Sequence, residues 1–203
     1  MDYKYLSASE KIEQLLVYRA CREERQYVAL YLSALRDNDL QTVEDFESFG
    51  NSTRHIIMNR REYDRGQLFG FTQKTMNEYG WLDNARFRNV ERIEFIDRKG
   101  WAVSNHITIG EGANGKWCCG VSYSTGGSGG GYGLSVWRKV YDSRKECLKA
   151  ALQELLNLHA EQRERLKDDP TNFNATLSNI VVKQVHAMLQ ETTVAKQLTL
   201  FFN

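Results

Sequence analysis

The stretch that decides the fold is WAVSNHITIGEGANGKWCCGVSYS, residues 101–124. It is rich in β-branched and aromatic residues, and Val103, Ile107 and Ile109 mostly alternate with polar neighbours, as in a strand with one buried face. Glycines and an asparagine interrupt the pattern at 110–115, which is typical of a turn between strands. Segments of this kind occur in order at 90–96, 101–109, 116–124 and 132–141. We therefore predict a four-stranded antiparallel meander with one face on a core.

Helix signals surround the predicted sheet. Ser143 and Glu146 form a capping box that begins a long helix, and Pro170 ends the segment that follows. Ser7 and Glu10 form another capping box at the start of a helical N-terminal third. Further helices are predicted at 42–49, from Ser52 or Thr53 through Ile57, at 65–79, and at about 174–190. The expected fold class is α+β, with the sheet packed on the long helix.

These elements divide the chain into successive regions. We predict a helical region at 1–88, a sheet plus helix at 89–168, a C-terminal helix at 169–191, and a free tail at 192–203. The residue pattern changes from helical spacing to β-rich segments near 84–89. We therefore place the boundary between the helical region and the sheet there.

The composition of the chain indicates its size class, its charge and its expected location. The 203 residues are 41% apolar and 26% charged, which suits one ordinary domain, with or without a small appendage. A net charge of +1 indicates that any nucleic-acid surface is a local patch. No apolar stretch has the length of a membrane span, and the N-terminal residues lack the apolar core of a signal peptide. The expected location is the cytoplasm.

No group of residues stands out as an active site. Cys119 and His106 lie on neighbouring predicted strands and are conceivable as a nucleophile and its base. A buried cysteine and an unrelated histidine are the more common arrangement. The spacing of the four cysteines fits neither a zinc ribbon nor a zinc finger. We therefore predict a protein that is not an enzyme and holds no metal or cofactor.

A glycine-rich run, TGGSGGGYG at 125–133, precedes the last predicted strand. It lacks the Lys-Ser/Thr ending of a phosphate-binding loop and leads into a strand, not into a helix. We predict a flexible hairpin connection. Two alternatives remain: a nest of backbone amides for an anion, or a mobile finger that follows a nucleic-acid backbone.

Aromatic and basic residues interleave around the predicted sheet. A sheet with exposed aromatic rings and flanking cations can stack bases and neutralise phosphates, although tryptophans are as often part of a core. The candidate nucleic-acid-binding residues are Arg98, Lys99, Trp101, Lys116, Trp137, Arg138 and Lys139.

The last residues carry the clearest indication of a partner. Gln197, Leu198, Thr199, Leu200 and Phe201 form a pentapeptide that resembles the short peptide by which bacterial replication and repair proteins bind the sliding clamp. The resemblance covers only these residues. It implies that Leu200 and Phe201 fill an apolar pocket of the clamp, while Gln197 forms a hydrogen bond at its rim.

The function predicted from these features is a non-enzymatic accessory protein of DNA replication or repair. It would bind the sliding clamp through Gln197, Leu198, Leu200 and Phe201, and its sheet would contact DNA. One alternative is a mobile-element or phage protein that inhibits or recruits the host clamp. Another is a homo-oligomeric assembly module with a buried tail and no nucleic-acid role.

Overall fold

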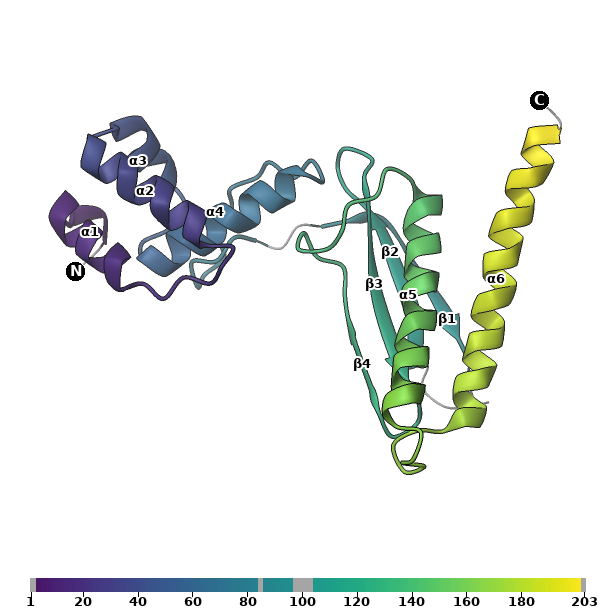
Figure 1. The fold of residues 1–203 in the computed structure, drawn as a ribbon. Helices are drawn as coiled ribbons and strands as arrows, with labels where there is room; N and C mark the ends of the chain where they lie inside the picture. Colours follow the sequence, from purple (N-terminus) through teal and green to yellow (C-terminus); the bar gives the residue numbers. More distant parts are fainter. Residues whose placement is uncertain (1–2, 84–85, 97–103, 202–203) are drawn as a thin grey trace. The chain divides into compact units, whose positions relative to one another are not determined.

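A computed structural model describes residues 3–83, 86–96 and 104–201, with side chains described as far as residue 191 (Figure 1). The chain divides into two compact units, Met1–Ala85 and Arg86–Asn203. The first unit is helical, and the second combines a four-stranded antiparallel sheet with two helices. The predicted α+β fold class is therefore confirmed.

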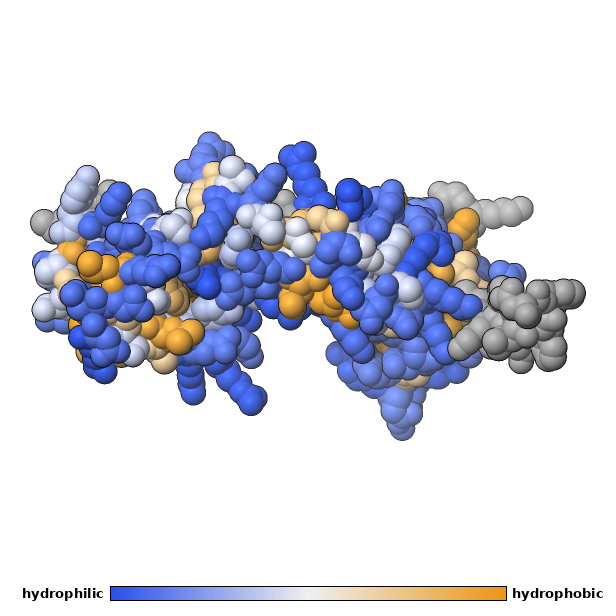
Figure 2. Space-filling view, turned by 90° about the horizontal axis from the view of Figure 1, so that it is seen from above, coloured by the Kyte–Doolittle hydropathy of each residue, from blue (hydrophilic) through white to orange (hydrophobic). Residues whose placement is uncertain are grey.

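The N-terminal unit is built from short helices that begin at polar caps. Its elements are the 3-10 helix η1 (Tyr3–Tyr5) and the helices α1 (Ala8–Val17), α2 (Arg25–Asp37), α3 (Leu40–Glu47) and α4 (Thr53–Gln67). The predicted capping box at Ser7 is present, and the side chains of Asp39 and Ser52 cap α3 and α4. The helices bury a core that includes Tyr31 and Ile56. Figure 2 shows separate apolar patches on the surface of this unit.

The predicted helix at 65–79 is wrong. Helix α4 ends at Gln67, and Gly70 follows in a left-handed conformation with φ of 78°, which ends the helical path. Further on, Met76 and Leu82 form an antiparallel bridge around a turn. Within the turn, Asn77 Oδ1 accepts from the N–H groups of Tyr79 and Trp81, and a distant side chain then holds the turn against α4.

That side chain is Asn59, which is fully buried on α4. Its Nδ2 donates to the carbonyl oxygens of Phe49 at 2.7 Å and Gly80 at 2.8 Å, and its Oδ1 accepts from the N–H of Leu82 at 3.1 Å. Asn59 therefore fixes the segment 76–82 against α4.

We expect Asn59→Ala to destabilise the N-terminal unit by about 2 kcal/mol, because buried backbone groups lose their partners. Hydrogen exchange followed by mass spectrometry should show faster exchange at 76–82. The matched control is Asn51→Ala, since the Asn51 side chain is exposed and contacts His55 Nδ1 at 3.1 Å. Equal exchange in both variants would contradict this role of Asn59.

The C-terminal unit is a sheet covered on one face by a helix. Its strands are β1 (Arg88–Phe95), β2 (Asn105–Glu111), β3 (Trp117–Ser124) and β4 (Gly129–Tyr132), in the order β1-β2-β3-β4. Helix α5 (Arg144–Arg165) packs on β2 and β3, and α6 (Ala175–Phe201) packs on α5 and β1 (Figure 1). The core joins alternate strand residues such as Ile107 and Val121 to Leu152 and Val185 on the helices.

Helix α5 begins where its cap predicts, but α6 is longer than predicted. The Ser143 hydroxyl accepts from the N–H of Glu146 at 3.2 Å, which confirms the helix start. The backbone of α6 is helical as far as Phe201, so residues 192–201, predicted as a free tail, continue the helix. No Gly or Pro occurs from Ala175 to Phe201, and the sequence therefore contains no strong stop signal.

The fourth strand differs from the prediction. It lies at Gly129–Tyr132, inside the glycine-rich run, and not at 132–141. After β4 the chain leaves the sheet and returns at Tyr141, whose backbone pairs with that of Trp117. The first part of the run, 125–128, connects β3 to β4 as a hairpin, and the second part forms β4 itself.

Close backbone packing explains several of the glycines. A Cβ atom on Gly131 would lie 2.6 Å from the Val121 oxygen, and one on Gly129 would lie 2.7 Å from the Tyr123 oxygen. A Cβ atom on Gly127 would lie only 2.4 Å from the oxygen of Thr171. Only residues without a side chain permit these approaches.

Candidate nucleic-acid interface

Most aromatic side chains of the sheet face the core. Trp117, Tyr123, Tyr132 and Tyr141 are partly buried and pack against the cluster between the sheet and α5. They follow the same alternation that buries Ile107 and Val121, so they do not form a stacking surface on the open face. Trp137 lies outside this cluster and is 39% exposed.

Part of the opposite face of the sheet is polar. Glu94 on β1, His106 on β2 and Ser122 on β3 lie in register across three strands, with Arg92 and Thr108 in the next row. The sequence analysis did not identify this row. Alternation shows which residues of β2 and β3 share a face, but the pairing register, which the structure supplies, is needed to align them.

The row lacks the contacts of an activated nucleophile. The Ser122 hydroxyl donates to the Ser104 oxygen at 3.0 Å, and Glu94 accepts from Arg92 Nε at 2.8 Å. Within the described part of the chain, His106 Nδ1 is buried without a hydrogen-bond partner. Burial lowers the pKa of His106, Arg92 lowers it further, and Glu94 opposes them, so the imidazole is neutral at pH 7.

The conceivable pair of Cys119 and His106 does not form. Cys119 faces the core opposite Ile109, where it is 4% exposed, whereas His106 points to the opposite face of the sheet. Cys119 instead lies in the core cluster that also contains Cys147 of α5. These thiols are packing groups between strand and helix.

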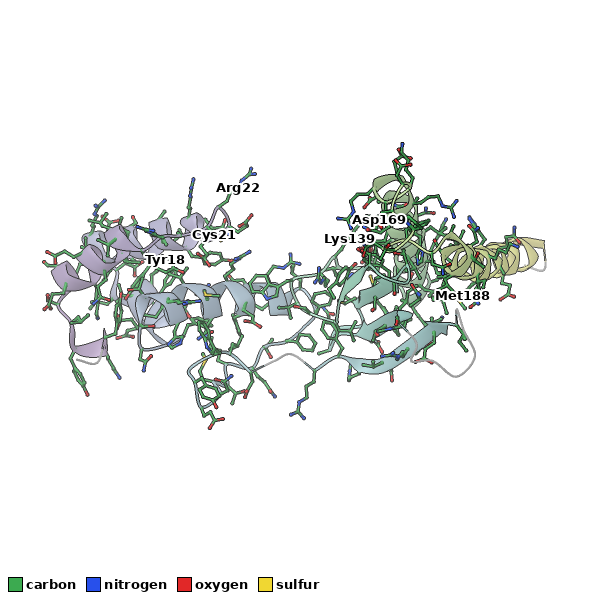
Figure 3. The ribbon with its side chains drawn as sticks, turned by 90° about the horizontal axis from the view of Figure 1, so that it is seen from below. Tyr18, Cys21, Arg22, Lys139, Asp169 and Met188 are labelled. Atoms are coloured by element: carbon green, nitrogen blue, oxygen red, sulfur yellow. The ribbon has the colours of Figure 1, made fainter. Side chains whose placement is uncertain are left out.

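Three of the predicted basic residues contact or flank β3, β4 and the segment that pairs with Trp117. The guanidinium of Arg138 lies 3.5 Å from the ring centroid of Tyr132, and Lys139 Nζ lies 5.4 Å from that of Tyr141. Lys116 pairs with Asp142 at 2.6 Å and precedes Trp117, the strand partner of Tyr141. We call Lys116, Arg138 and Lys139 the basic cluster; Figure 3 labels Lys139 beside the sheet.

Cation–π contacts hold Arg138 and Lys139 in place, and the ion pair with Asp142 holds Lys116. Burial raises the pKa of Tyr132, and the nearby Glu154 of α5 raises it further. Of the other predicted residues, Trp137 immediately precedes Arg138, whereas Arg98, Lys99 and Trp101 lie outside the described residues.

Positive charge is concentrated in the C-terminal unit. Residues 86–203 include 16 Lys and Arg against 12 Asp and Glu, whereas residues 1–85 include 11 against 14. The near-neutral chain therefore combines an acidic and a basic unit. Only the second has the sign of charge that attracts nucleic acid.

Comparison with protein-family models, with curated proteins and with solved structures gives no match. Among the residues that the structure describes, no three or more His, Cys, Asp or Glu side chains are grouped so that they could hold a metal ion. Over the same residues, no helix combines the length and the apolar character needed to cross a membrane. The proposals below therefore depend on the chemistry of the chain itself.

Proposed function

We propose that this protein is a non-enzymatic accessory protein of DNA replication or repair that binds a sliding clamp and contacts DNA. The observation that carries the proposal is the pentapeptide from Gln197 to Phe201, which resembles the clamp-binding peptide. The basic cluster of Lys116, Arg138 and Lys139 is the proposed contact with DNA.

The position of the pentapeptide supports this proposal. Leu177, Val181 and Val185 anchor α6 in the core, and Leu189 packs beside them. The helical backbone continues to Phe201, which is roughly 18 Å beyond Leu189 at 1.5 Å per residue. The pentapeptide is thus the last part of α6, beyond the residues that anchor this helix in the core.

Tethering explains how a chain with a net charge of +1 could act on DNA. A clamp that encircles DNA raises the effective concentration of any module bound to it, so a weak DNA contact suffices. Three basic residues on a surface of both charges are enough for such a weak contact. Tight DNA binding without a clamp would need more cations.

We expect the double variant Leu200→Ala, Phe201→Ala to weaken binding to a bacterial sliding clamp by more than about 100-fold. Two buried anchors contribute roughly 3 kcal/mol or more together, and 1.4 kcal/mol corresponds to a tenfold change in Kd. Isothermal titration calorimetry of the full chain against the purified clamp measures this difference.

The matched control is Thr192→Ala, Thr193→Ala, which also changes two residues of the C-terminal segment but leaves the pentapeptide intact. It should bind the clamp like the wild type. Equal affinity of the anchor variant and this control would rule out the proposed anchors. No binding by the wild type would rule out the clamp as the partner.

A further inference from the structure

Strand β4 is an edge of the described sheet. It has β3 as a neighbour on one side, and Gly129, Gly130 and Gly131 are exposed. In an antiparallel pair, alternate residues direct both backbone groups away from the partner strand. The outer side of β4 therefore presents N–H and C=O groups that no side chain of these glycines covers.

The opposite edge, β1, is protected in the usual ways. Arg88, Glu91, Arg92 and Glu94 place charges along it, and Asn89, with φ of 47°, marks an irregularity in its pairing. Charged side chains and bulges prevent unwanted pairing at sheet edges. Apart from its short length, β4 has none of these features.

Packing does not explain all the glycines of this edge. Gly129 and Gly131 are needed for the close approach to β3, but a Cβ atom on Gly130 would meet nothing nearer than 3.4 Å. A Cβ atom on Gly133, directly after β4, would meet nothing within 4 Å. Side chains would therefore fit at Gly130 and Gly133, yet both positions are glycine.

The surroundings of the edge favour an anion over another strand. Arg138 stacks on Tyr132, the last residue of β4, and Lys139 follows Arg138 in the sequence, whereas Lys116 pairs with Asp142 at the start of β3. A partner strand is normally stabilised by cross-strand side-chain pairs, which three glycines cannot supply. Exposed backbone amides next to fixed cations suit the oxygen atoms of a phosphate.

We infer that the outer edge of β4, together with Arg138, contacts the phosphodiester backbone of DNA. This rests on the proposed function and adds to it a mode of contact: backbone amides bind phosphate, without base readout. Such binding is independent of sequence and weakens as salt concentration rises.

The exposed Gly133 allows a direct test by charge reversal. Because its surroundings are open, Gly133→Glu and Gly133→Lys should both fold normally. Gln190→Glu and Gln190→Lys introduce the same charges on α6, which packs on β1 at the other edge of the sheet. Fluorescence anisotropy with a labelled duplex oligonucleotide, over a range of salt concentrations, measures the affinity of each full-length variant without the clamp.

We expect Gly133→Glu to weaken duplex binding at least fivefold and Gly133→Lys to strengthen it, with the salt-dependence slope increasing by about 1 for the lysine variant. The Gln190 variants should change affinity less than twofold. Equal effects at both positions would overturn the edge contact and leave the proposed function standing. No duplex binding by the wild type would overturn both the edge contact and the proposed DNA role, without affecting the clamp titration.

Discussion

Replacing His159 by alanine is expected to lower the free energy of unfolding of the C-terminal unit by about 3 kcal/mol, because a buried side chain and its hydrogen bonds are lost together. His159 lies on α5 and is 1% exposed. Its Nε2 lies 3.0 Å from Asn105 Oδ1, and its Nδ1 lies 2.8 Å from the Ser178 hydroxyl.

The partners of His159 determine its role. Asn105 Oδ1 also accepts from the N–H of Ser124, and Asn105 Nδ2 donates to the Ser124 oxygen, so the amide oxygen is directed toward His159 Nε2–H. Nδ1 of the same tautomer can accept from the Ser178 hydroxyl. One imidazole therefore joins β2, β3, α5 and α6 through a buried and fully satisfied network.

Urea unfolding combined with hydrogen exchange can measure this effect, since exchange at β2 and β3 reports on the C-terminal unit separately from the helical one. The control is His186→Ala, which removes an exposed histidine on α6 and should change stability by less than about 0.5 kcal/mol. Similar losses in both variants would mean that the network contributes little.

Gly131→Ala is expected to destabilise the sheet by about 2 kcal/mol, whereas Gly133→Ala should be neutral or slightly stabilising. A Cβ atom at Gly131 would lie 2.6 Å from the Val121 oxygen and 2.8 Å from Ser122 Cα, so β4 must move away from β3. At Gly133 the methyl group has open space, and alanine reduces the freedom of the unfolded chain.

Exchange of the β3 and β4 amides distinguishes these two variants. Gly131→Ala should speed exchange at residues 121–124 and 129–132, and Gly133→Ala should not. If both variants retained wild-type exchange, β4 would tolerate a side chain at Gly131, and the glycine-rich run would not be explained by backbone packing. Because this comparison uses no ligand, it is independent of the proposed DNA contact.

The elements that were predicted correctly are those whose signals lie within a few residues of each other. The β-rich segments predicted at 101–109 and 116–124 correspond to β2 at 105–111 and β3 at 117–124, and capping boxes marked the starts of α1 and α5. Each signal acts through neighbours on the same segment, so the sequence displays it directly.

Two of the errors occur where a distant segment supplies a partner. The segment 76–82 is attached to α4 by Asn59, and β4 depends on how closely β3 approaches its glycines. Glycine-rich sequence normally indicates a flexible connection, and only the backbone of β3 converts this run into a strand.

The candidate sites divide in the same way. The clamp-like pentapeptide can be recognised from residue order alone, because a short docking peptide carries its own recognition groups. The basic cluster needed the structure, since the bridge between Trp117 and Tyr141 brings Lys116 to the segment with Arg138 and Lys139.

Local pattern was thus enough to establish the α+β class, the starts of the capped helices and the resemblance at Gln197–Phe201. Tertiary structure decided the position of β4, the burial of the sheet aromatics, the separation of Cys119 from His106 and the network around His159. The physical reason is that helix caps and strand alternation act over a few residues. Strand register, burial and side-chain hydrogen bonds instead join residues that are far apart in the chain and meet only when it folds.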